Sequence, residues 1–290
     1  MKRFFEEYGG IVLGILAVLV LIAMVSPVGG KIKESLTGVT KRFDEKMKDS
    51  MAEPISKTES YVGYYADTNG DGTVDGVIFA DLAVGGSGEW NPSNFSWATK
   101  NKSGVYSYSA IPAGELKNYT ISKDSYSGKF GDKPVLKATG SGKNRFYVMA
   151  LENIDSNEYA WYDAARGKMN DCNSITSKNF GAGKQNTATM ISKWNNKAYG
   201  EQNTNQYGHK DMWSKITNNG WFVPSIGEWA AFAGNLGVTK DNYSSLGLSW
   251  HCWSSSLESC LNAFLVSFGN GNMGSGNVNY GFYVRLATTF

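Results

Sequence analysis

The longest apolar stretch of the chain lies near its N-terminus and predicts a membrane-spanning helix. Residues 11–25 contain no charged side chain, and the uncharged stretch around them covers residues 8–30. A helix needs roughly 20 predominantly apolar residues to cross the core of a bilayer. A cleaved secretory signal is the alternative, but its apolar region is only about 7–15 residues long, and Ser26-Pro27-Val28 is a poor cleavage site. We therefore expect residues 1–30 to be retained as an anchor, held in the lipid bilayer through residues 8–30.

The charges on either side of this helix give conflicting signals about its orientation. Lys2 and Arg3 precede it, whereas six Lys and Arg residues follow it within residues 31–48. The positive-inside rule counts Lys and Arg, and by itself places the C-terminal side in the cytoplasm. The polar composition of the remaining chain, together with a family resemblance of its last seventy residues, favours the opposite orientation. We expect a single-pass membrane protein with an extracellular C-terminal domain, and the conflict stays open.

The segment after the anchor has the apolar spacing of one face of a helix. Its apolar positions recur at intervals of three and four residues, at Ile32, Leu36, Val39, Phe43 and Met47. This spacing predicts a short amphipathic stalk that continues the membrane helix. Pro54 then marks a linker into the globular part, so stalk and linker together occupy residues 31–58.

Residues 61–66 and 77–82 are predicted to be strands joined by a polar turn. Asn-Gly and Asp-Gly dipeptides between apolar segments are a strong hairpin signal. The spacing of the turn also matches the first nine positions of an EF-hand calcium loop, with candidate ligands Asp67, Asn69, Asp71 and Asp75. The twelfth position of such a loop is a bidentate Glu, and here it is Ile78. A plain hairpin and a loop that binds Ca²⁺ both stay open, and no cofactor is required.

The last seventy residues have the most informative pattern. Ser225 and Glu228 have the spacing of a capping box ahead of an apolar run, which predicts a short helix. Strands are expected at residues 253–256, 263–268 and 283–286, with a Gly/Asn-rich loop before the last of them. Farther toward the N-terminus we expect a buried strand at residues 145–151 and a helix at residues 187–199.

Composition narrows the class of protein. Residues 59–290 are long enough for one sizeable domain, and the 34 Gly residues indicate short strands joined by many turns. The net charge of +2 offers no electrostatic footprint for nucleic acid. Three Cys residues are few for a disulfide scaffold. Cys252 and Cys260 could pair and leave Cys172 alone, and a fold without disulfides is an equal alternative.

The order of the C-terminal pieces resembles the C-type-lectin-fold variable proteins of diversity-generating retroelements, relatives of the formylglycine-generating enzyme fold. In that family a Trp-x-x-Pro-Ser-x-x-Glu-Trp-type helix precedes a Trp-Ser-Ser-Ser-type strand, and a diversified stretch ends at a Val-Arg-Leu strand. The matching pieces here begin at Trp221, Trp253 and Val284. The resemblance is good over the last seventy residues, vague from Tyr61 onward, and absent from the membrane helix.

This resemblance implies an α+β fold with a C-type-lectin-like domain over residues 59–290. The one transmembrane helix and the short helical stalk before this domain are expected from the apolar pattern instead. It also implies a variable region at about residues 247–283. Adenine-directed mutagenesis of Asn codons never produces Lys, Gln, Glu, Met or Trp. Between Leu257 and Tyr283 only Glu258 and Met273 fall outside the permitted set.

The resemblance implies that side chains of this region contact a ligand, which we expect to be a protein or another cell-surface molecule. The candidate contact residues are Ser249, His251, Cys252, Leu257, Ser259, Leu261, Leu265, Ser267, Ser275, Asn277, Asn279, Tyr280 and Phe282. For Leu265 and Phe282 the alternative is that they only fill the core.

The function expected from the sequence is a surface-displayed receptor or adhesin and not an enzyme. A pilin-like structural subunit is the first alternative, because Glu6-Glu7-Tyr8-Gly9 ahead of the apolar helix resembles Flp-type pilins. A formylglycine-generating-type enzyme is a weaker one, since it needs two closely placed active-site cysteines, for which Cys252 and Cys260 are the candidates.

Overall fold

The computed structural model describes residues 52–90, 104–162, 175–195, 204–217 and 219–290. The predicted anchor and most of the predicted stalk lie outside these residues and stay predictions. Within the described ranges, no helix combines the length and the apolar character needed to cross a membrane.

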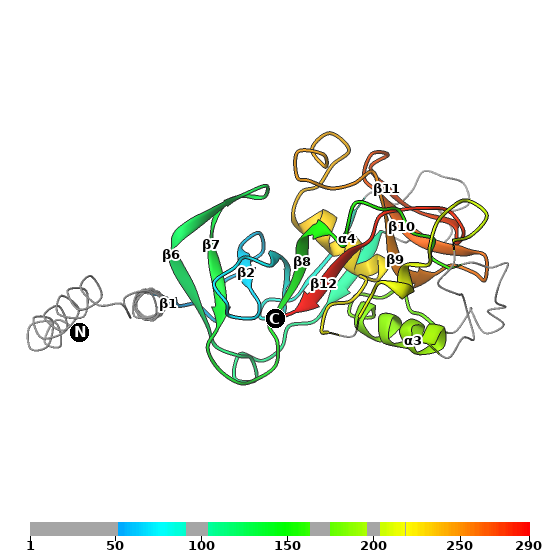
Figure 1. The fold of residues 1–290 in the computed structure, drawn as a ribbon. Helices are drawn as coiled ribbons and strands as arrows, with labels where there is room; N and C mark the ends of the chain where they lie inside the picture. The colour runs from blue at the N-terminus through cyan, green and yellow to red at the C-terminus, as the bar shows by residue number, and fades with distance from the viewer. Residues whose placement is uncertain (1–51, 91–103, 163–174, 196–203, 218) are drawn as a thin grey trace, which may run out of the picture. The chain divides into compact units, whose positions relative to one another are not determined.

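The described residues are mostly β-sheet with two α-helices, an α+β arrangement (Figure 1). The largest sheet has the strand order β1-β6-β7-β2-β3-β8-β12, and only the pairing of β2 with β7 is parallel. Its strands are β1 (Glu53–Pro54), β2 (Tyr65–Asp67), β3 (Gly76–Asp81), β6 (Tyr119–Gly128), β7 (Gly131–Ala138), β8 (Phe146–Asn153) and β12 (Arg285–Thr289). A second sheet has the order β11-β10-β9, with β9 (His251–Leu257), β10 (Asn262–Ser267) and β11 (Asn272–Asn277). The remaining pair is β4 (Gly86–Glu89) with β5 (Val105–Tyr108).

The compact C-terminal unit begins at Glu53, earlier than the predicted boundary at residue 59. The segment expected to be a linker is part of the domain, because Glu53 and Pro54 pair with β6. The guanidinium of Arg145 also donates to the carbonyl oxygens of Ser56 and Glu59, at 2.7 and 2.6 Å. These bonds satisfy backbone acceptors that would otherwise need water.

The two helices agree with the sequence pattern, with shifted ends. Helix α3 (Gly183–Asn195) begins four residues before the predicted start at residue 187. Helix α4 (Ile226–Asn235) begins at the predicted capping box. The Ser225 hydroxyl accepts from the amide of Glu228 at 3.2 Å, and the Glu228 carboxylate accepts from the amide of Ser225 at 2.6 Å. A short 3₁₀ turn, η1 (Met212–Ser214), lies between the two helices in the sequence.

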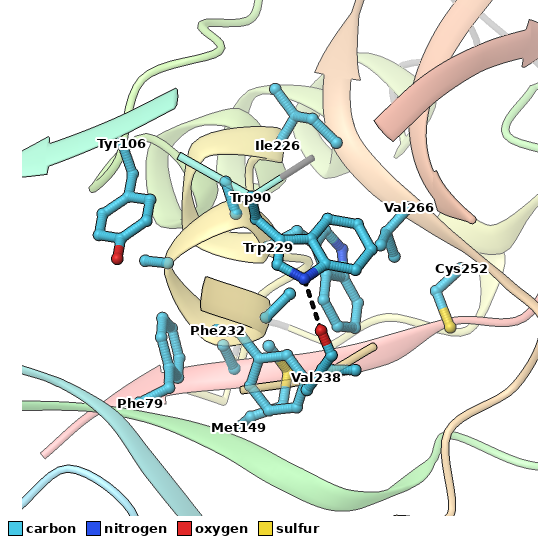
Figure 2. Close-up of a cluster of buried hydrophobic side chains, with 14 of the residues drawn as sticks. Phe79, Trp90, Tyr106, Met149, Ile226, Trp229, Phe232, Val238, Cys252 and Val266 are labelled. Atoms are coloured by element: carbon cyan, nitrogen blue, oxygen red, sulfur yellow. Dashed lines mark hydrogen bonds between the residues drawn. The ribbon is translucent and has the colours of Figure 1, made fainter. Parts of the chain in front are cut away.

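The core around α4 is built from aromatic rings that are also fixed by hydrogen bonds. Figure 2 shows the indole of Trp90 donating to the carbonyl of Val238, at 2.6 Å, beside Trp229 and Phe232. Trp229 and Trp253 each donate to a backbone carbonyl in the same way. A buried indole that has a partner contributes its apolar area without leaving an unsatisfied donor. The core beneath the C-terminal segment is therefore closely packed, and hydrogen bonds fix the orientation of its Trp rings.

The second sheet corrects the prediction of a Gly/Asn-rich loop and shows which of its residues are buried. The Gly/Asn-rich stretch expected to be a loop contains β11, which pairs with β10 along its whole length. Strand β10 is buried on both faces. Phe264 and Val266 belong to the core cluster around α4, whereas Ala263 and Leu265 belong to the cluster around Trp161.

Candidate functional site

The predicted variable region, residues 247–283, covers the whole second sheet and the turns that join its strands. The region has a buried part, made by the strands, and an exposed part, made by the ends of the strands and the turns between them. The separation between these two environments decides which of the candidate residues can meet a ligand.

Several of the exposed large apolar side chains lie at the ends and turns of this sheet. The large apolar side chains that the described residues expose are Val84, Val105, Tyr126, Tyr207, Trp250, Leu261 and Tyr280. Trp250, Leu261 and Tyr280 lie in the predicted variable region and are 52%, 57% and 50% exposed. Tyr207 is 54% exposed, and its ring lies edge-on to Tyr280 with centroids 5.9 Å apart. Four of these seven residues therefore belong to the region or contact it.

A series of ring contacts connects this surface to the core. Trp250 lies beside His251, with centroids 6.2 Å apart, and His251 lies 4.9 Å from Phe282. Phe282 packs on buried Trp253, at 4.6 Å. Partial burial lowers the pKa of His251, which favours the neutral imidazole. Phe282 is half-buried and packs on the core, and its contact with a ligand stays a prediction.

The contribution of residues 204–209 was not predicted from the sequence. The amide of Asn205 donates to the carbonyl of Asn279 at 2.8 Å, and its oxygen accepts from the backbone of Tyr207 and His209. The ring of His209 lies so close to Gly281 that a Cβ at that position would overlap it. The loop that carries Tyr207 is thus fixed to the turn that carries Tyr280. No local signal could have shown this, because the two loops are more than seventy residues apart.

Four candidate contact residues are buried, which argues against their expected contact with a ligand and, for Leu265, favours the alternative that it fills the core. They are Cys252, Leu257, Leu265 and Ser267. Cys252 and Leu265 lie in the core because β9 and β10 are covered on both faces. A ligand cannot reach these side chains on the folded domain.

The other candidates are accessible in part, and several of them shape the surface through hydrogen bonds. Leu261 and Tyr280 are exposed, and the partly exposed candidates are Ser249, His251, Ser259, Ser275, Asn277, Asn279 and Phe282. The Ser275 hydroxyl donates to Glu258 at 2.5 Å, and Asn277 accepts from the amide of Asn279 at 3.0 Å. Ser249 accepts from the side chain of Asn153 at 2.8 Å. These polar groups hold the turns in place while the apolar groups remain available.

The hairpin predicted from strands at residues 61–66 and 77–82 is confirmed with shifted ends, since β2 and β3 pair antiparallel around the polar turn. Both oxygens of Asp67 accept from backbone amides, those of Gly70 and Gly72. The carboxylate of the candidate ligand Asp75 accepts hydrogen bonds from the backbone amide and the hydroxyl of Thr68. Asn69 and Asp71 form hydrogen bonds with each other.

All four candidate calcium ligands are thus used by the turn itself. Across the described ranges, no three or more His, Cys, Asp or Glu side chains are grouped in a way that could hold a metal ion. Calcium binding at this turn stays a prediction.

The cysteines are not arranged as the sequence suggested. Cys252 is a free, buried thiol, and burial raises its pKa to about 12. Cys260 is disulfide-bonded, so these two residues do not pair with each other. Cys172 lies outside the described residues. Cys252 and Cys260 do not provide the two neighbouring thiols that formylglycine-generating chemistry would need.

No protein-family model matches the chain, and a comparison with curated proteins finds no match.

Proposed function

We propose that the protein is a membrane-anchored, surface-displayed receptor or adhesin with a C-type-lectin-like domain. Its binding surface is the exposed part of the variable region together with the loop of residues 204–209. The observation that supports this most is that exposed Trp250, Leu261, Tyr280 and Tyr207 lie at the ends and turns of a tightly packed sheet, or against them, with Tyr207 and Tyr280 in ring contact. Contiguous exposed apolar side chains mark interaction sites on folded domains, and Tyr207 with Tyr280 is the contiguous pair here.

The division between scaffold and surface favours a variable binding site. Loops held by a rigid scaffold accept substitution at small cost in stability, because exposed side chains make few contacts. Aromatic rings supply contact area and Ser and Asn supply adaptable hydrogen bonds, as in antibody paratopes. Residues 247–283 contain one carboxylate, Glu258, and no Lys or Arg. Apolar contact and neutral hydrogen bonds therefore dominate the recognition that we propose.

A selection experiment on the full-length protein, displayed on cells, tests this function. One library varies five candidates of the proposed surface: His251, Ser259, Leu261, Ser275 and Tyr280. The control library varies five residues of the β6–β7 hairpin: Lys123, Asp124, Ser125, Ser127 and Lys133. Each library is selected for binding to one soluble test protein, ubiquitin.

We expect the first library to stay folded and to yield specific binders, because its positions lie on the strands and turns of one packed sheet. Exposed substitutions cost about 0.5 kcal/mol or less. The control library should fold equally well and yield none. The proposal fails if the two libraries perform alike, or if the first one loses its folded state.

A further inference from the structure

A small cavity lies at the tip of the β6–β7 hairpin and involves no residue of the proposed binding surface. Its volume is about 310 Å³, which is at the small end of the range of ligand sites in proteins. It is lined by Tyr126, Ser127, Gly128, Lys129, Phe130, Leu151 and Glu152. The first five residues belong to the hairpin and the last two to β8.

The hairpin side of the cavity is held in shape by buried Tyr65. Its hydroxyl donates to the carbonyl of Gly131 at 3.1 Å and accepts from the amide of Phe130 at 3.0 Å. Its ring lies edge-on to Tyr126, with centroids 4.8 Å apart. A Cβ at Gly128 would overlap the Tyr65 hydroxyl, so the close approach requires glycine. The cavity is therefore formed before any ligand arrives, which lowers the entropic cost of binding.

Two opposite charges line this cavity without neutralising each other. Lys129 and Glu152 form no ion pair or side-chain hydrogen bond with any other described residue. The Lys129 ammonium lies against Gly247, where an added Cβ would be 2.7 Å from Nζ. Glu152 also attracts the buried guanidinium of Arg285. Phe130 and Leu151, both partly buried, add apolar side chains to the lining of the same cavity.

We propose that this cavity binds a small zwitterion of the amino-acid type. The ligand's carboxylate faces Lys129 and its ammonium group faces Glu152, while an apolar side chain lies against Phe130 and Leu151. Each charge of the ligand meets an opposite charge, and such charge-assisted hydrogen bonds are the stronger class. This inference is independent of the proposed function, because it uses a different part of the domain.

Calorimetric titration of the full-length protein with free L-phenylalanine tests the proposal from the ligand side. The comparison ligands are N-acetyl-L-phenylalanine, which keeps only the negative charge, and L-phenylalanine methyl ester, which keeps only the positive one. We expect saturable binding of the zwitterion, and affinity about tenfold weaker for each comparison ligand, because each has lost one charge-assisted hydrogen bond.

Two single substitutions test it from the protein side. Lys129→Met and Glu152→Gln should each weaken binding of the zwitterion about tenfold. Lys123→Met and Glu158→Gln, at exposed positions outside the cavity, should not change it. Thermal unfolding of all four variants shows that the fold is kept. Absence of saturable binding overturns the proposal, as does equal affinity for the three ligands. If Glu152→Gln unfolds, the three-ligand comparison on the unaltered protein still decides.

Discussion

Replacing Arg145 by Met should reduce the free energy of unfolding by about 3–5 kcal/mol, the cost of breaking a buried ion pair. Arg145 and Asp81 are both buried and form two hydrogen bonds, at 2.8 and 2.9 Å. Without the guanidinium the Asp81 carboxylate stays buried and unpaired. The carbonyls of Ser56 and Glu59 also lose their donor. The measurement is chemical denaturation, with hydrogen exchange of residues 53–61 as a local probe.

Lys143→Met is the matched control for this substitution. Lys143 lies two residues away and pairs with Glu115 at 2.5 Å, but the two side chains are 63% and 46% exposed. Because solvent screens such pairs, its loss should cost less than about 1 kcal/mol. Similar losses for the two variants would show that the Arg145–Asp81 pair does not hold the N-terminal edge of the domain.

The free energy of unfolding should fall by about 3 kcal/mol between pH 4.5 and pH 7 through the contribution of Glu228. Burial raises the pKa of this carboxyl from 4.5 to about 7, against hydrogen bonds from Ser225 and Gly183 that lower it. The folded state therefore keeps the proton that the unfolded chain releases near pH 4.5. The stabilisation is complete below pH 4.5, is lost as the pH rises toward 7, and changes no further above it.

Glu228→Gln should remove this pH-dependent step, because the amide does not titrate. The exposed Glu158→Gln should leave it in place. The measurement is chemical denaturation at a series of pH values. The quantity compared is the difference in the free energy of unfolding between each variant and the unaltered protein at each pH. Parallel pH profiles for Glu228→Gln and the unaltered protein would contradict the assignment.

The features that could be predicted from the sequence are local ones. The Ser225–Glu228 capping box, the turn between β2 and β3, and the buried strand β8 each depend on residues close together in the chain. Turn chemistry and capping act within a few residues, so the sequence pattern is sufficient to identify them.

The features that could not be predicted depend on pairing across long separations. Strand β11 has Gly and Asn where strands usually have β-branched residues, and it exists because β10 pairs with it. The sequence leaves open whether Leu265 contacts a ligand or fills the core, because the burial of both faces of β10 is not visible in its alternating pattern. Tyr207 belongs to the candidate surface through contacts between distant loops, those of Asn205 with Asn279 and of Tyr207 with Tyr280.

The central claim is that residues 247–283 form a diversified binding surface, and sequencing the DNA around the gene tests it most directly. We predict a near-copy of the 3′ end of the gene, beside a reverse transcriptase gene, that differs only at adenines. The differences should fall on codons of accessible residues, such as Leu261 and Tyr280, and not on those of the buried core, such as Trp253. The absence of a copy, or differences spread over core codons, would contradict the claim and favour a fixed ligand or a structural role.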